Sequence, residues 1–192
     1  MNAYPLSDVA IPIAITELAQ YLTVDASDPV LPSVALSATD AIITHLERDL
    51  VPRKWRLVVK EVPPQHPQLH STFPNLRTSG HHHGIRLISS FPGWVDLPFG
   101  ALEVHSVKDK DGNPLEYKED LFSRPARIFV ETFEQFIVEY TAGFEHVPEA
   151  ILEAVKALAA FMYERRGHCE AGEALHRSGA AGMVKRWRIE RL

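Results

Sequence analysis

The sequence predicts an α+β protein, mainly a helical bundle packed on a small antiparallel sheet. Three observations support this fold class. Apolar residues recur at helical spacing near both ends of the chain, and they alternate with polar residues through the middle. The composition, with 45% hydrophobic and 23% charged residues, is too apolar for a disordered chain. A chain of 192 residues is also long enough to bury roughly 70% of its unfolded surface.

Two helices are predicted before the first strand. The first covers residues 12–22, where Pro12 suits a first turn and apolar residues share one face: Ile15, Leu18, Ala19 and Leu22. The second covers residues 31–50, with Pro32 near its start and Pro52 after its end. Its apolar stripe consists of Ala35, Ala38, Ile42 and Leu46.

From Lys54 onward the apolar period changes to two, which is the pattern of a half-buried strand. Trp55, Leu57 and Val59 would face the core. Further strands are predicted near residues 85–89, 101–108, 126–131 and 136–142. The sequence DKDGN, residues 109–113, contains the Asp-Gly pair that favours tight hairpin turns.

A sharp corner is predicted between the last strand and a third helix over residues 148–166. Gly143 permits backbone angles closed to other residues, and Pro148 pre-sets the first helical turn. The helix has one apolar face, and Gly167 is suited to end it. That face consists of Ile151, Ala154, Val155, Leu158 and Met162.

Two segments do not resemble core. Residues 62–83 are rich in proline and histidine and too long for an ordinary connection. The tail passes Gly172, Gly179 and Gly182, which weaken a continuous helix. We therefore expect one domain over residues 1–167 and a flexible C-terminal arm over residues 168–192.

The long loop raises the question of a metal site. His81, His82 and His83, with His66 and His70 nearby, could bind a transition metal. Adjacent residues of an extended chain point in opposite directions, however, so three consecutive histidines rarely close one site. The loop is more simply interpreted as a polar tip, and we expect no metal and no cofactor. A metal-binding module or metal-dependent enzyme is the alternative to a purely structural protein.

A second motif mimics a calcium loop. Asp109, Asp111 and Asn113 occupy the first three ligand positions and Asp120 the twelfth. Pro114 stands where a sharply turning glycine is usual, and the preferred final Glu is absent. A hairpin turn explains the segment better.

No sequence pattern indicates catalysis. Cys169 follows His168 directly, whereas a nucleophile needs its base across a hydrogen bond, which sequence neighbours seldom provide. The chain has no Gly-rich phosphate loop, nucleophile elbow or paired-cysteine zinc spacing. The single cysteine and the lack of a leader-like start favour a reducing cytosol, and no apolar run approaches the roughly 20 residues of a membrane span. We expect the protein not to be an enzyme.

The tail carries the candidate binding residues: Lys185, Arg186, Trp187, Arg188 and Arg191. Cations around an indole suit a nucleic-acid patch, but Trp and Arg are also the residues most enriched in interface hot spots. A solvated helix end remains a third interpretation. We favour docking to a protein over nucleic acid, because the net charge of −5 opposes phosphate binding.

The order of elements and several motifs resemble the head-tail connector (adaptor, or head completion) family of long-tailed bacteriophages and prophages. The resemblance covers most of residues 12–167. It begins with AITELAQYLTVD and a helix leading to RKWRL, and continues through LPFGALEVHSVKDKDGNPLEY. The most specific motif is VEYTAGFEHVPEAILEAVKALAAFMYERRG. Residues 62–83 depart from the family pattern, which crosses there in fewer residues.

The resemblance implies a virion structural protein that forms a ring, expected to be dodecameric, between the portal and a tail-side stopper or tail completion protein. DNA would pass through the lumen during packaging retention and ejection, without sequence-specific binding. The protein would assemble in the bacterial host cytoplasm and reside in the virion neck. The C-terminal arm would contact the portal or a neighbouring subunit.

Overall fold

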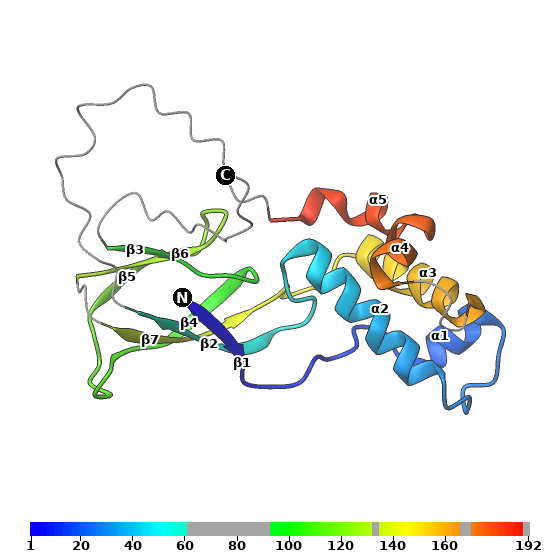
Figure 1. The fold of residues 1–192 in the computed structure, drawn as a ribbon, viewed down its shortest axis with the longest axis horizontal. Coiled ribbons are helices and arrows are strands. Elements are labelled where there is room, and N and C mark those ends of the chain that lie inside the picture. The colour runs from blue at the N-terminus through cyan, green and yellow to red at the C-terminus, as the bar shows by residue number, and fades with distance from the viewer. Residues whose placement is uncertain (61–92, 132–134, 166–169, 190–192) are drawn as a thin grey trace, which may run out of the picture.

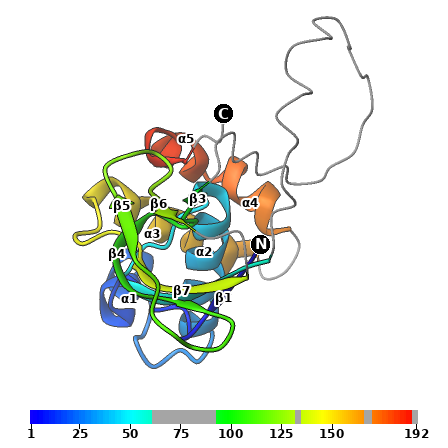
Figure 2. The same cartoon turned by 90° about the vertical axis from the view of Figure 1, so that its left-hand side faces the viewer.

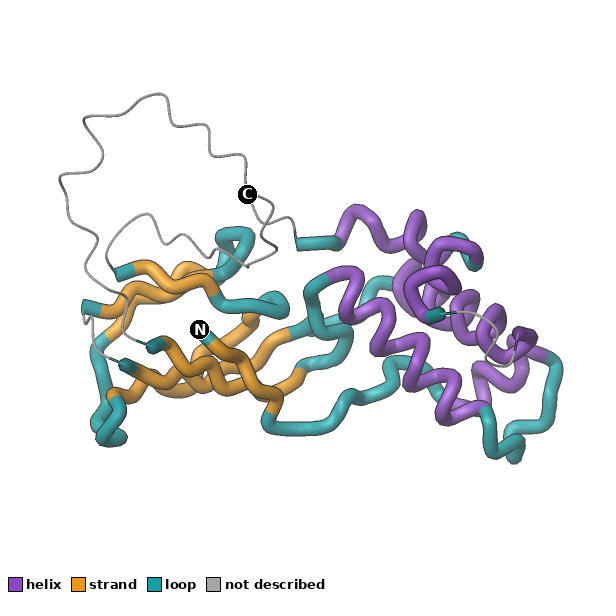
Figure 3. The backbone as a smooth tube through the Cα atoms, in the orientation of Figure 1, coloured by secondary structure: helices purple, strands orange, loops and turns teal. Residues whose placement is uncertain are grey.

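The computed structural model describes residues 1–60, 93–131, 135–165 and 170–189, and it confirms the predicted α+β class. Strands gather at one end of an elongated molecule and helices at the other (Figure 1; Figure 3). We call these ends the sheet lobe and the helical lobe. None of the helices in the described ranges combines the length and the apolar character that crossing a membrane requires.

The sheet lobe consists of two small antiparallel sheets, whose arrangement is seen from the strand end in Figure 2. The first has the order β1-β2-β7-β4, with β1 Asn2–Pro5, β2 Arg53–Val59, β7 Phe136–Ala142 and β4 Ala101–Asp109. The second has the order β3-β6-β5, with β3 Trp94–Asp96, β6 Arg127–Val130 and β5 Tyr117–Asp120.

The apolar faces of the two sheets form one core. Trp55, Leu57 and Val59 are buried as their period-two spacing predicts, and they lie with Val138 and Tyr140 of β7. Every residue pairs in register between β2 and β7, from Arg53 opposite Ala142 to Val59 opposite Phe136.

The helical lobe has its own core. Its elements are α1 Ile15–Leu22, α2 Leu31–Leu46, α3 Glu149–Arg165, α4 Ala171–Arg177, α5 Ala180–Val184 and a short 3-10 helix η2 Lys185–Trp187. The predicted stripe of α2 is buried against α3. Lys156 of α3 links the bundle by binding Glu17 of α1 at 2.5 Å and Glu153 at 2.8 Å.

The two cores are separate. Within the described residues, the main contacts join helices to helices and strands to strands, and the bundle lies beside the sheets end to end without covering a sheet face. Each lobe therefore buries its own apolar surface, and the segments between them carry polar contacts.

The predicted elements agree with the structure to within a few residues at most boundaries. The second helix ends at Leu46, earlier than the predicted residue 50, because Glu47 takes a left-handed conformation with φ 52. Ile13 is buried in the helical core although α1 begins at Ile15. The structure adds β1, β3 and β5, which were not predicted. The strand predicted at 85–89 lies outside the described residues, as does the loop 62–83.

The corner between β7 and α3 forms as predicted. Gly143 has φ 133, and a Cβ placed there would lie 2.7 Å from the carbonyl oxygen of Val51. Pro148 precedes the helix, and its carbonyl oxygen accepts the Ile151 N–H at 2.8 Å. Glycine is thus required by both backbone angle and space.

The tail differs from the flexible arm that its glycines suggested. The described residues 170–189 contain α4, α5 and η2, and four of their apolar side chains belong to the helical core: Ala174, Leu175, Ala180 and Val184. Gly172 and Gly182 lie inside α4 and α5, and of these three glycines only Gly179, with φ 80, stands between the two helices, as the N-cap of α5. A division at residues 167 and 168 stays a prediction, because residues 166–169 are not described.

Candidate functional site

A groove of about 930 Å³ lies between the sheet lobe and the last helical elements. Three parts of the chain line it: the segment from Gly182 to Ile189, the loop from Leu121 to Ala126, and Arg48 with residues 100–102. Four of the five tail residues proposed from the sequence lie here: Lys185, Arg186, Trp187 and Arg188. Arg191 lies outside the described residues. We call this feature the cationic groove.

The tail wall of the groove is held by two anchors. Val184 is fully buried in the helical core, and the Ile189 N–H donates to the carbonyl oxygen of Leu46 at 3.1 Å. Between these anchors the Arg186 guanidinium stacks over the Trp187 ring, 3.9 Å from its centroid. The exposed cations of this wall are therefore carried on backbone that is fixed at both ends.

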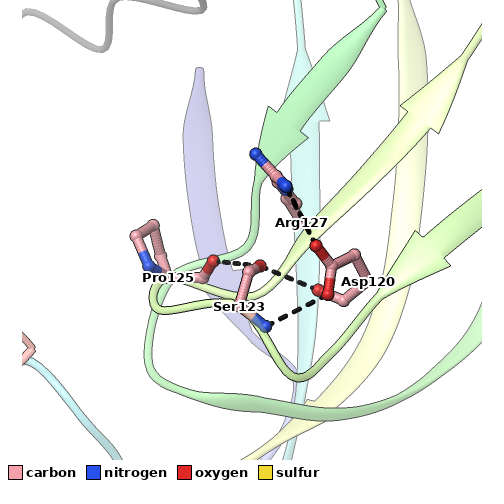
Figure 4. A network of polar contacts seen from close by, with 4 residues as sticks. All are labelled: Asp120, Ser123, Pro125 and Arg127. Carbon is pink, nitrogen blue, oxygen red and sulfur yellow. Dashed lines mark hydrogen bonds and ion pairs between the residues drawn. The ribbon is translucent and has the colours of Figure 1, made fainter.

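The opposite wall is the loop that joins β5 to β6, and polar contacts brace it (Figure 4). The Asp120 carboxylate accepts the Ser123 N–H at 3.1 Å and pairs with Arg127 at 3.0 Å. The Ser123 hydroxyl lies 3.0 Å from the Asp120 carbonyl oxygen and 2.6 Å from that of Pro125. The Arg124–Pro125 peptide bond is cis. This network fixes the backbone that presents Phe122 and Arg124.

Phe122 is the most exposed apolar side chain in the described part of the molecule, with a relative accessibility of 100%. It stands at the rim of the cationic groove, beside Arg124. Contact with a partner would remove this large aromatic surface from water, and the braced loop already holds the ring in place.

Arg48, which lies in the segment between α2 and β2, also lines the groove. Its guanidinium donates to the Gly143 carbonyl oxygen at 3.0 Å and stacks 3.9 Å from the Phe144 ring centroid. Burial, together with the positive charge of Arg124, lowers the pKa of the Arg48 guanidinium. Arg48 therefore has a structural role and also adds positive potential.

The charge of the groove is one-sided. Among the described residues, its lining includes five cations and no carboxylate: Arg48, Arg124, Lys185, Arg186 and Arg188. None of the five forms an ion pair with a carboxylate of the described residues. Apolar side chains lie between them, including Leu102, Phe122, Met183 and Trp187. Such a surface can hold a ligand that has both negative charge and apolar groups.

The sequence did not reveal the contributions of Arg48, Phe122 and Arg124. Arg48 follows a helix and Arg124 lies between strands, far from the tail in the chain, and only the fold brings them to the groove. Phe122 in the sequence LFSRPA has the form of an ordinary turn residue. No local pattern distinguishes it from an aromatic residue that is buried.

The residues of the candidate metal and thiol sites lie outside the described structure. His66, His70, His81, His82 and His83 lie outside it, as do His168 and Cys169. The described residues hold no cluster of three or more metal-ligating side chains.

The calcium-like motif forms a turn. Both carboxylate oxygens of Asp109 accept hydrogen bonds inside it, from Asp111 N–H at 2.9 Å and from the backbone and side-chain amides of Asn113 at 2.8 and 2.9 Å. These bonds lower the pKa of the Asp109 carboxyl, the side chain of Asn113 contributing most. The backbone then returns beside β4, where Lys108 bridges Pro114. The hairpin interpretation of DKDGN agrees with this geometry.

A buried polar cluster lies at the junction of the lobes. The carboxylate of Asp49, which is 1% exposed, accepts the indole N–H of Trp55 and lies 3.8 Å from Arg53. Burial raises the pKa of the Asp49 carboxyl, although Trp55 and Arg53 act in the opposite direction. Burial and the charge of Asp49 raise the pKa of Tyr140, whose hydroxyl has no hydrogen-bond partner among the described residues. This cluster is enclosed and serves to join the lobes.

No protein-family model and no curated protein sequence matches the chain. Solved structures of gene transfer agent (GTA) particles do match, over 100% of this chain and 97% of the matched chain. One is the neck of an empty GTA particle computed with C6 symmetry, with 18% identity and a TM-score of 0.69. Another is the neck of a native GTA particle computed with C12 symmetry, with 19% identity and a TM-score of 0.68. A third is the virion of a native GTA particle, with 17% identity and a TM-score of 0.67.

The likeness extends over the whole chain, so it includes both lobes and is not limited to a common supersecondary unit. The sequence indicated a head-tail connector type of fold, and the structures that share the fold are chains of phage-like particle necks and virions. The chain has the fold of a virion neck protein.

Proposed function

We propose that this protein is a structural adaptor of the neck of a phage-like particle. It forms a ring between the portal and the tail-side proteins and leaves a conduit for DNA. The observation that carries the proposal is the full-length similarity of fold to chains of GTA necks computed with C6 and C12 symmetry. Such a protein acts by shape and subunit contact and catalyses no reaction. It would assemble in the host cytoplasm and end in the virion neck.

A ring of identical subunits needs two different patches on each copy, which meet across every interface. Apart from Phe122 and Met183 at the groove, the described surface exposes large apolar side chains in two separate regions. Tyr4 and Leu6 lie at and beyond β1 of the sheet lobe, and Tyr21, Val30 and Leu36 lie on the α1 and α2 side of the helical lobe. Contact between one region and the other on the next copy would produce a ring if the rotation closes.

The overall charge supports passage of DNA without retention. A net charge of −5 repels phosphates on average, so a duplex in the lumen would meet little general attraction. The positive charge of the cationic groove is local, and we assign it to a protein contact. Its tail residues, Lys185, Arg186, Trp187 and Arg188, together with Arg191, are proposed to bind the portal or a neighbouring subunit.

Electron microscopy of the purified protein, alone and after incubation with its portal, tests the function. We expect rings that stack coaxially on the portal ring. A protein that stays monomeric under both conditions and is absent from purified particles would refute the adaptor role.

Point substitutions are better suited than truncation to test the tail. A truncation after Gly182 would remove Val184 from the helical core and destabilise the fold. Trp187→Ala and Arg186→Glu change the groove without touching a fully buried side chain. If the tail contacts the portal, both variants form rings that stack on it poorly, whereas Lys118→Glu on the exposed part of β5 stacks normally. Equal stacking of all three would remove the tail from the contact.

A further inference from the structure

We propose that the cationic groove receives an extended acidic polypeptide segment with apolar side chains, contributed by a protein that adjoins this one in the particle. The inference rests on the proposed function and specifies the chemistry of the partner at the groove. The described lining of the groove has cations without a carboxylate and exposes aromatic and aliphatic surface, and these two properties define the ligand.

Charge complementarity is the first argument. Four of the lining cations are exposed and come from both walls: Arg124 from one side and Lys185, Arg186 and Arg188 from the other. Carboxylates placed between the walls would make charge-assisted hydrogen bonds to both, and arginine can bind a carboxylate with two parallel bonds. No carboxylate among the described lining residues competes for these cations.

The apolar lining favours a polypeptide over a nucleic acid. Phe122 and Met183 are exposed at the groove, and Trp187 is half-buried beneath Arg186. The phosphates of a duplex would satisfy the cations, but its sugar-phosphate edge would leave these side chains in water. An acidic segment that also bears apolar side chains covers them, and aromatic residues with arginine are the usual anchors of protein interfaces.

The groove is prepared for binding in its present form. One wall is tied by Val184 and by the Ile189 to Leu46 hydrogen bond, and the other is braced by Asp120 and Ser123. Ordering of side chains and loops is a main cost of association, and fixed walls reduce that cost. An extended segment can therefore bind between them with little rearrangement of the backbone.

The test uses the full-length protein and a labelled probe. A short fluorescein-labelled peptide in which Glu alternates with Leu and Phe is titrated with protein, and its anisotropy is recorded. A matched peptide with Gln in place of every Glu, and a labelled short DNA duplex, are titrated in parallel. We expect the acidic peptide to bind at least about tenfold more tightly than the Gln peptide and more tightly than the duplex.

Matched variants locate the binding. Lys185→Glu and Arg124→Glu should each weaken the acidic peptide about tenfold, while Lys118→Glu, the same reversal outside the groove, leaves it unchanged. Phe122→Ala should weaken binding of the acidic peptide. Tyr21→Ala, which truncates an exposed aromatic residue outside the groove, should leave that binding unchanged. Circular dichroism of each variant confirms that the fold is kept.

Three results would overturn the inference: equal binding of the Glu and Gln peptides, wild-type affinity in both groove reversals, or tighter binding of the duplex, which would make the groove a phosphate site. These outcomes are independent of the adaptor role. If rings still form on the portal while the groove variants bind the probe normally, the inference fails and the proposed function stands. If the probe binds at the groove but the protein never enters a particle, the proposed function fails.

Discussion

Replacement of Gly143 by alanine tests the account of the corner between β7 and α3. The residue has φ 133, a conformation that side chains rarely adopt, and such strain costs about 1 to 3 kcal/mol. A Cβ would also lie 2.7 Å from the Val51 carbonyl oxygen and 2.9 Å from its carbon. These are backbone atoms that cannot rotate away, so the crowding adds about 1 to 3 kcal/mol. We expect Gly143→Ala to lower the free energy of unfolding by about 2 to 6 kcal/mol.

The assay is urea denaturation followed by tryptophan fluorescence and circular dichroism. Gly112→Ala is the matched control, because Gly112 also has a positive φ, 89, but a Cβ there meets nothing within 4 Å. The control should show only the strain, so the difference between the two variants measures the crowding against Val51. If Gly143→Ala destabilises the protein no more than Gly112→Ala does, the steric reasoning is wrong.

Substitutions at three other residues test the polar contacts. Asp49→Ala should lower the free energy of unfolding by about 2 kcal/mol, because it leaves the buried indole N–H of Trp55 without its acceptor. Asp49→Asn keeps an acceptor and should lower it less. Because the pKa of Asp49 is raised in the folded state, protonation of Asp49 favours folding. The free energy of unfolding of the wild type, relative to that of Asp49→Asn, should therefore fall as the pH rises above 3.8, the ordinary pKa of the carboxyl group. A difference that does not change with pH would contradict this. Tyr140→Phe removes a buried hydroxyl that has no hydrogen-bond partner among the described residues, so thermal denaturation should show equal or greater stability; a loss above about 1 kcal/mol would contradict this. Ser123→Ala removes the hydroxyl that contacts the Pro125 carbonyl oxygen, and it should therefore weaken binding of the acidic peptide without changing the global stability. Unchanged affinity would mean that this contact does not matter for binding.

Local signals in the sequence predicted the regular elements well. The alternation from Trp55 to Val59 is a property of one short segment, and so is the pairing of Gly143 with Pro148 at the corner. In these cases the residues that carry the signal also make the structure. The periodic face of α3, with Ile151, Val155 and Leu158, is likewise buried as its spacing predicts.

Elements whose partner lies far along the chain were missed. β1 is four residues long, includes Pro5 and exists because it pairs with β2, from Asn2 opposite Val58 to Pro5 opposite Trp55. The four residues of β1 alone do not predict that it pairs with β2. β3 is three residues long and depends in the same way on β6.

The tail was the main misinterpretation. Its glycines predicted a free arm, but Ala174, Leu175 and Val184 find a place in the helical core. The short helices α4 and α5, separated by Ser178 and Gly179, bury apolar residues as one long helix would, and propensity alone does not show this. The same packing places Lys185 to Arg188 against the loop of Arg124, so the groove could not be assembled from the tail sequence alone.

The two separate cores determine how the molecule carries mechanical load. In the described chain, three covalent segments cross between the lobes: residues 6–14, residues 47–52 and residues 143–148. Any tension that pulls the lobes apart is therefore divided among three connecting segments, and the contacts of the buried Asp49 and the partly buried Arg48 resist sliding of one lobe against the other. Each lobe can keep its own packing while force is transmitted through the junction.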